Sequence, residues 1–314
     1  MKSIYKKTLS ILLLLVILAL FAYYIYNHLY DFKELQIVNP FYIIVLIILF
    51  IVNYYFTSSI LDILLRPFKI SLNFVEAFMV SISTGFYNLI TPFRGGMIAR
   101  GVYLKKQYKF PYVDFLSTLA ASYVLIFLVA SIFGLLSTYL LYQSTQNFSY
   151  IIPGIFLFVF ISMLSIIVFS PKIPQSNNSY INKFIKVING WHLIKNNKRV
   201  IFATLVISTL QLLISSFMLF LQFKVFDIHV SFISCLFLSS IGSIGILLAI
   251  TPAGLGISEV ITVFSALTIG ITPAQSLTAT ILGRVISMIV LFTLGPIFSY
   301  ILLKRSNKIK NKKK

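Results

Sequence analysis

The chain has 314 residues, of which 59% are hydrophobic and only 11% are charged, and its formal net charge is +19. So little charge cannot cover the surface of a soluble domain of this size, which indicates an all-α polytopic integral membrane protein. The apolar runs continue for about twenty residues without period-two alternation, which excludes a β-barrel. Because the cations flank these runs, we attribute them to membrane topology and anionic headgroups, and we expect no nucleic-acid partner.

Six apolar runs are long enough to span a bilayer, and they predict full spans at about 9–26, 40–61, 111–141, 149–169, 200–223 and 274–303. The first run is followed by tyrosines and not by a small-residue cleavage site, so we interpret it as an uncleaved helix.

The distribution of cations sets the orientation. Lys33 and Lys224 lie outside on this topology, and Arg94, Arg100 and Arg284 lie at membrane depth, which leaves 21 of the 26 lysines and arginines in the cytoplasm. The positive-inside rule therefore predicts a multi-pass plasma-membrane protein with both termini cytoplasmic, the basic tail 304–314 included.

A basic loop between the fourth and fifth of these spans has apolar residues at helical spacing. Ile181, Phe184, Ile185, Ile188 and Trp191 recur there between lysines. The pattern predicts a short helix lying on the surface of the inner leaflet, and a soluble helix packed on the loop is the alternative.

Two further apolar segments are too short to span, and each is interrupted by proline and glycine. The segment 74–90 restarts at 95 and ends among lysines, and the segment 232–250 restarts at 256 and continues to 269. A full crossing by the first segment would place those lysines outside, so a re-entrant helical hairpin fits the positive-inside rule better. The break residues are Thr91, Pro92, Gly95 and Gly96 in the first hairpin and Thr251, Pro252, Gly254 and Gly256 in the second.

The two breaks are related by an internal repeat. A shift of 160 residues superposes Thr91-Pro92 on Thr251-Pro252 and Gly96 on Gly256. We predict one transmembrane domain, 1–314, with one repeat at about 8–142 and another at about 150–303. Loop charges make the hairpins open from opposite sides, which predicts an inverted repeat with its site at the midplane.

The breaks combine exposed backbone with ionisable side chains. A restarted helix presents free N–H groups, and Arg94 and Arg100 add guanidinium groups that match phosphate, with Asn88 within reach. These residues predict a site for a lipid phosphate. Glu259 needs a partner at membrane depth, for which Arg284 is the first candidate and Arg94 or Arg100 are others. Glu259 and Arg284 can form a structural ion pair or a gate, and both interpretations stay open.

The remaining polar residues indicate no catalytic or metal chemistry. His28, His192 and His229 lie in separate loops without metal-ligand spacing, so we expect no cofactor. Glu76 and Asp114 fit helix N-terminal acids, and the residues specify no oligomeric state.

Asn88, Pro92, Arg94, Gly95, Arg100 and the run from Thr251 to Glu259 together resemble a known family. They are similar to the transmembrane region of lysylphosphatidylglycerol synthases, a flippase-like domain that also occurs alone. Met97 stands where the family usually has a glutamate, which puts in doubt any mechanism that needs a carboxylate in the first break.

The resemblance implies a flippase that moves a phosphate-bearing lipid between leaflets: an anionic or aminoacylated phospholipid, or a polyprenyl-phosphate carrier. Arg94, Arg100, Asn88, Glu259 and Arg284 are its expected binding residues. The family's C-terminal aminoacyltransferase domain has no counterpart in this sequence, so catalysis is not expected here. The alternatives are a membrane component of a lipid-modifying enzyme and a scaffold, each with a separately encoded transferase as partner.

Overall fold

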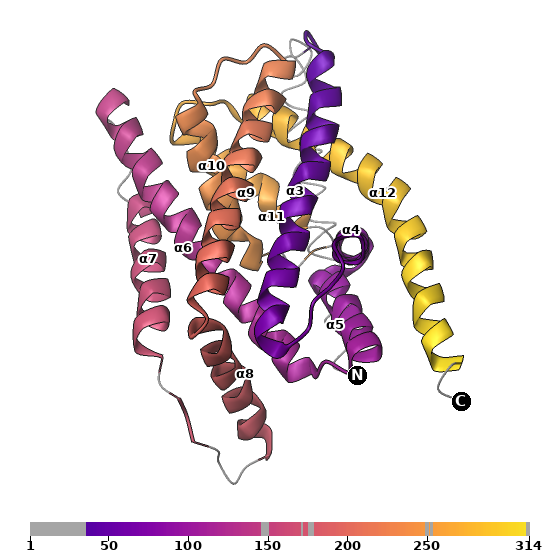
Figure 1. Ribbon diagram of the computed structural model, residues 1–314. Coiled ribbons are helices and arrows are strands. Elements are labelled where there is room, and N and C mark those ends of the chain that lie inside the picture. The colour runs from indigo at the N-terminus through magenta and orange to yellow at the C-terminus, as the bar shows by residue number, and fades with distance from the viewer. Residues whose placement is uncertain are drawn as a thin grey trace, which may run out of the picture.

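The computed structural model describes residues 36–145, 151–170, 172–174, 179–248, 251 and 254–311. The described elements are helices (Figure 1): α3 (Phe41–Leu65), α4 (Phe74–Ile90), α5 (Gly95–Tyr108), α6 (Tyr112–Thr145), α7 (Ile151–Phe169), α8 (Ser179–Lys195), α9 (Lys198–Val225), α10 (Phe232–Gly245), α11 (Ile257–Leu267) and α12 (Pro273–Asn311). Three short 3-10 turns accompany them: η1 (Arg66–Phe68), η2 (Pro92–Arg94) and η3 (Ile246–Leu248). The predicted span 9–26 and the break residue Pro252 lie outside the described residues.

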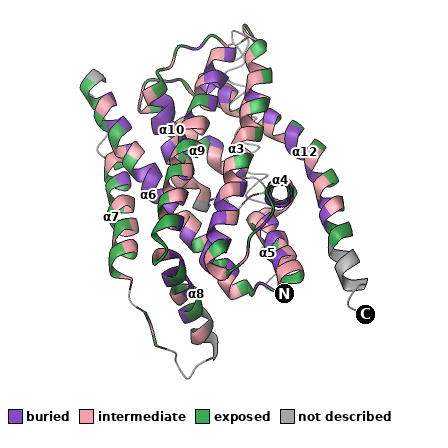
Figure 2. Cartoon of the chain, viewed as in Figure 1, coloured by how far each residue is buried: buried purple, intermediate pink, exposed green. Residues whose placement is uncertain are grey.

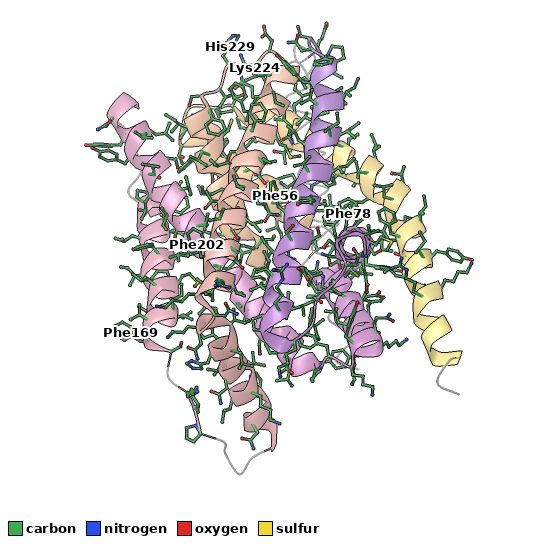
Figure 3. The ribbon with its side chains drawn as sticks, viewed as in Figure 1. Phe56, Phe78, Phe169, Phe202, Lys224 and His229 are labelled. Atoms are coloured by element: carbon green, nitrogen blue, oxygen red, sulfur yellow. The ribbon has the colours of Figure 1, made fainter. Side chains whose placement is uncertain are left out.

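Five described helices are long and apolar enough to cross a membrane: Phe41–Phe68, Tyr112–Gln143, Ile151–Phe169, Lys198–Val225 and Pro273–Arg305. They confirm five of the six predicted spans. Their outward faces carry large apolar side chains, such as Phe169 and Phe202, which are 77% and 70% exposed. Figure 2 shows the exposed residues along the outside of the bundle, as expected where lipid replaces water. Lys224 and His229 lie at the end of the bundle opposite α8 (Figure 3), as the predicted topology requires.

The shorter apolar helices form the two predicted hairpins. α4 and α5 have 17 and 14 residues and pack against each other across η2. α10 and α11 have 14 and 11 residues and form the second pair. Each of these four is shorter than the roughly 20 residues typical of a full span, as the predicted re-entrant hairpins require.

The first helices of the two halves have the relative direction that the predicted inverted repeat requires. α3 and α9, the first helices of each half, run antiparallel: the Val38 N–H donates to the Val225 carbonyl at 2.9 Å, and Leu64 packs with Val200 at the opposite ends. The halves also exchange partners, because α4 packs on α12 and α10 packs on α6. Each hairpin is thus held by the long helix of the other half.

Polar side chains join α3 to α9 inside the bundle. The Asn53 amide donates to Ser215 Oγ at 2.8 Å, and Gln211 Nε2 donates to Asn53 Oδ1 at 3.1 Å and to Thr57 Oγ1 at 2.8 Å. Such interhelical hydrogen bonds stabilise membrane bundles by about 0.6 kcal/mol each.

Helix α8 forms in the basic loop as predicted, but it does not lie wholly on the leaflet surface. Ile185 and Trp191 are buried against the end of the bundle, and Trp191 Nε1 donates to Ser170 Oγ at 3.0 Å. Phe184 and Ile188 remain exposed. The helix uses part of its apolar face to cover α6 and α9, so it packs on the transmembrane bundle and not on the loop.

Candidate functional site

The first break is built by residues in unusual backbone conformations. Thr91 ends α4 in an extended conformation, and Phe93 and Arg94 follow with φ of 54° and 55°, in the left-handed region. Thr91 Oγ1 donates to the Tyr87 carbonyl, which satisfies one of the last acceptors of α4. The chain therefore reverses within four residues, and α5 returns beside α4.

Gly95 and Gly96 allow the two helices of this hairpin to approach. A Cβ atom on Gly96 would lie 2.0 Å from the Thr84 carbonyl oxygen and 2.7 Å from Asn88 Oδ1. One on Gly95 would lie 2.4 Å from Thr91 Oγ1. Any larger side chain at Gly96 must push α5 away from the backbone of α4.

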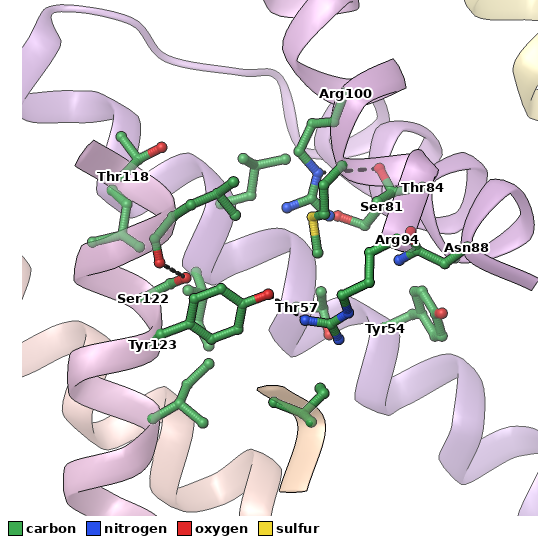
Figure 4. Close-up of a pocket in the computed structure, with 18 of the residues that line it drawn as sticks. Tyr54, Thr57, Ser81, Thr84, Asn88, Arg94, Arg100, Thr118, Ser122 and Tyr123 are labelled. Atoms are coloured by element: carbon green, nitrogen blue, oxygen red, sulfur yellow. Dashed lines mark hydrogen bonds between the residues drawn. The ribbon is translucent and has the colours of Figure 1, made fainter. Parts of the chain in front are cut away.

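Arg94 and Arg100 point from this hairpin into the bundle (Figure 4). Arg94 Nη1 donates to Tyr123 Oη on α6, and its guanidinium lies 5.7 Å from the centre of that ring. Arg100 is buried, and its Nε donates to Thr84 Oγ1 at 3.1 Å. The ion pairs within the described residues are Asp62–Arg66 and Glu259–Arg284, so neither arginine of the first hairpin has a described carboxylate partner.

These arginines line a cavity of about 300 Å³ between α3, α4, α5 and α6. Most of its wall is apolar, with Met97 among the apolar lining residues, and polar groups are interspersed in it. The hydroxyl of Ser81 and the amide oxygen of Asn88 also line it, and both are buried with no hydrogen-bond partner among the described residues. The other polar lining residues are Asn53, Tyr54, Thr57, Thr84, Thr118, Ser122, Tyr123 and Gln211. The cavity is positively charged and holds unused hydrogen-bonding groups.

The second break carries its own carboxylate. Gly254 and Gly256 have φ of 67° and 82°, which favours glycine, and α11 begins at the next residue. Glu259, at the third position of α11, accepts a hydrogen bond from the Gly256 N–H at 2.8 Å. Thr251 Oγ1 donates to the Leu255 carbonyl at 2.7 Å and closes the loop.

Glu259 is buried and forms an ion pair with Nε of Arg284, its first predicted partner. Ser258 Oγ also donates to the carboxylate at 3.2 Å, and Arg284 Nη2 donates to the Gly254 carbonyl at 3.3 Å. Both oxygens of Glu259 are thus engaged. The pair ties the loop and the start of α11 to α12.

The two restarted helices differ in the residue at their third position. Met97 is the third residue of α5, as Glu259 is the third residue of α11. A carboxylate at that position offsets the positive end of the helix dipole and accepts from its free N–H groups. The start of α11 is neutralised in this way, whereas α5 has no side-chain cap and adds two arginines.

A second cavity of about 370 Å³ borders the first and extends to the second break. Residues that line both cavities include Tyr54, Asn88 and Arg94. Arg284 and Ser258 line the second, while Glu259 is absent from the described lining of both and lies behind Arg284. The structure therefore places Asn88, Arg94, Arg100 and Arg284 in the walls of two cavities that share lining residues, and Glu259 holds Arg284 from behind.

Sequence reasoning missed the aromatic partners of this site. Tyr123 on α6 and Tyr54 on α3 line the cavities beside Arg94, together with the amides of Asn53 and Gln211. Each of these polar side chains lies in the middle of an apolar span, and that position could have identified them as site residues.

Of the other acids, Glu76 lies in the first turn of α4 as expected, but it also accepts hydrogen bonds from Tyr103 Oη at 2.6 Å and Tyr108 Oη at 2.8 Å. It joins the start of α4 to α5. Asp114 lies in the first turn of α6.

Comparison with known proteins agrees with this architecture. The family model described as the lysylphosphatidylglycerol synthase TM region matches residues 7–295. The UPF0104 membrane protein MJ1595 of Methanocaldococcus jannaschii is 27% identical, over 98% of this chain and 99% of that protein. No solved structure matches the chain. The chain is therefore a multi-pass membrane protein that belongs to the family of the lysylphosphatidylglycerol synthase transmembrane region.

Proposed function

We propose that this protein moves a phosphate-bearing lipid between the leaflets of the plasma membrane, with its headgroup passing through the two bordering cavities. The observation that carries the proposal is the charge of the first cavity. Arg94 and Arg100 line it, and neither forms an ion pair with a described carboxylate. The substrate class is an anionic or aminoacylated phospholipid or a polyprenyl-phosphate carrier.

The energetics favour an anionic ligand over an empty site. An uncompensated guanidinium held away from bulk water costs several kcal/mol. A phosphate relieves that cost, because the guanidinium fork donates two parallel hydrogen bonds to its oxygens. Arg100 offers its terminal nitrogens to the cavity, since its described hydrogen bond uses only Nε.

Arg94 is the residue that connects the path. It lines both cavities, and the second of these cavities is also lined by Arg284. A phosphate that leaves Arg100 meets Arg94 next and then Arg284. Glu259 holds Arg284 in the meantime and releases it when the phosphate arrives, so the structural ion pair also serves as the gate.

The path runs between hairpins that enter from opposite sides, as alternating access in an inverted repeat requires. With both termini in the cytoplasm, the first hairpin opens toward the inner leaflet and the second toward the outer leaflet.

A leaflet-resolved assay in proteoliposomes tests the proposal. Labelled phosphatidylglycerol is placed in one leaflet, and its loss from that leaflet is followed with and without protein. Arg94→Gln is expected to slow protein-dependent transfer at least tenfold, since a charged hydrogen bond contributes about 1.5–3 kcal/mol. Arg199→Gln, an exposed arginine at the start of α9, is the matched control and should transfer lipid at the wild-type rate. Transfer no faster than in protein-free vesicles, for anionic and polyprenyl-phosphate lipids alike, would refute the proposal.

A further inference from the structure

A third cavity of about 250 Å³ lies outside the two cavities already described, between α4, α5 and α12. Each helix contributes side chains at spacings of three or four residues, which places them on one helical face. The cavity is lined by Val80, Ser83, Thr84, Tyr87, Ala99, Arg100, Val102, Tyr103, Lys106, Ser299, Leu302 and Leu303. Two of its walls belong to the first hairpin and the third to the long helix of the second repeat.

The polar groups of this cavity are those that bind an anion. Lys106 and Arg100 are its charged residues, and none of the described residues that line it is acidic. Ser83 on α4 and Ser299 on α12 both line the cavity with 6% and 7% exposure, and neither hydroxyl has a hydrogen-bond partner among the described residues. Each of these hydroxyls is able to donate a hydrogen bond to a ligand or a water in the cavity.

The cavity opens toward the surface that lipid covers. Lys106 is exposed, and Leu303 at the mouth is 59% exposed. Tyr300 and Ile297 continue this exposed apolar strip along α12, whose C-terminal half lies on the outer side of the bundle beside α5 (Figure 1). A ligand at this mouth is therefore in contact with acyl chains, which favours a lipid over a phosphate that comes from solution.

We infer that this cavity is a lateral portal that binds the phosphate of an anionic lipid before it reaches the central site. Lys106 attracts the headgroup at the mouth, and the hydroxyls of Ser83 and Ser299 donate hydrogen bonds to its phosphate inside. Arg100 lines both this cavity and the first one, so it can receive the phosphate from the portal. The passage of the lipid from this portal to the central site rests on the proposed function. The binding of the lipid in the portal does not.

Photocrosslinking from the mouth tests the binding site. p-Benzoylphenylalanine replaces Leu303 in the full chain, and the protein is placed in nanodiscs with equal amounts of labelled phosphatidylglycerol and phosphatidylcholine. Phe158 on the outside of α7 is the matched control, because it is also a highly exposed apolar residue. We expect at least a fivefold preference for phosphatidylglycerol at Leu303 and none at Phe158, and Lys106→Gln should abolish the preference.

Equal labelling of the two lipids at Leu303 would overturn the inference. Millimolar glycerol phosphate in the buffer distinguishes the two sources of phosphate. Loss of the crosslink in its presence would show that the cavity serves a soluble phosphate, and would also overturn the lipid portal.

A variant with the cavity filled distinguishes a failure of the portal from a failure of the proposed function. Ser299→Trp places a large ring in the cavity, and Thr293→Trp places the same ring on an exposed position of α12. Ser299→Trp should reduce both the crosslink and transport at least tenfold, and Thr293→Trp should reduce neither.

If Ser299→Trp abolishes the crosslink while transport stays at the wild-type rate, the portal fails and the proposed function stands. If the wild type shows the lipid preference but no transport, the proposed function fails and the binding site stands. Lys106→Gln changes an exposed side chain, so it provides the same test if Ser299→Trp does not fold.

Discussion

The ion pair between Glu259 and Arg284 makes a quantitative prediction about stability. Glu259→Gln removes the charge that compensates Arg284 but keeps an oxygen that can accept from the Gly256 N–H. Removing one partner of a buried ion pair costs about 3–5 kcal/mol, because the other charge is left uncompensated. The side chain of Arg284 is 16% exposed, which places the expected cost near the lower limit, at about 3 kcal/mol.

The double variant Glu259→Gln/Arg284→Gln should recover much of that loss, because it leaves no unpaired charge. The expected coupling free energy is about 2–3 kcal/mol, in the upper part of the range for residues in contact. The pair Asp62–Arg66 is the matched control, since it joins the same charge types one helical turn apart with the Arg66 side chain 60% exposed. Its coupling should be about 0.3–0.5 kcal/mol.

The coupling can be measured by reversible unfolding in mixed micelles. The chain has one tryptophan, Trp191, which packs against the end of the bundle and reports on its loss through fluorescence. A coupling for Glu259–Arg284 no larger than that of Asp62–Arg66 would refute the assignment of Glu259 as the residue that holds Arg284 and α11 in place.

Three further predictions follow from the hairpins and from the contact between α3 and α9. Gly96→Ala should destabilise the protein by about 1–3 kcal/mol, because its Cβ would meet the backbone of α4, whereas Gly154→Ala, with open space around it, should change stability little in the same unfolding assay. Met97→Glu should lower the affinity for phosphatidylglycerol in nanodiscs, since the new carboxylate competes for Arg94 and caps α5; an unchanged affinity would contradict that placement. Gln211→Ala should cost about 1 kcal/mol, because it removes two interhelical hydrogen bonds, and unchanged unfolding would show that they contribute nothing.

The features that the sequence predicted are those that depend on local chemistry. The sequence predicts the bounds of α4, Phe74–Ile90, because the apolar length and the Thr91-Pro92 break are visible in the chain itself. The pair of short-helix hairpins could be predicted because similar Thr-Pro breaks recur 160 residues apart. The sequence also predicts the pairing of Glu259 with Arg284, because few charges lie at membrane depth and each needs a partner.

The features that the sequence did not predict depend on contacts between distant elements. The bond from Arg94 to Tyr123 requires α5 to fold back against α6, and no local pattern specifies which tyrosine it meets. Helix α8 has an amphipathic pattern that fits a leaflet surface and a helix bundle equally well. The bundle covers Trp191, because α6 and α9 leave an apolar end exposed there.

The proposal for the first cavity is tested most directly by the headgroup selectivity of transport. The rates for phosphatidylglycerol and phosphatidylcholine are compared in the same proteoliposomes, for the wild type and for Arg94→Gln/Arg100→Gln. The wild type should favour the anionic lipid at least tenfold, which corresponds to about 1.4 kcal/mol, and the double variant should transfer both lipids at similar slow rates. Equal rates for the two lipids in the wild type, or an unchanged ratio in the double variant, would contradict a phosphate site at these arginines.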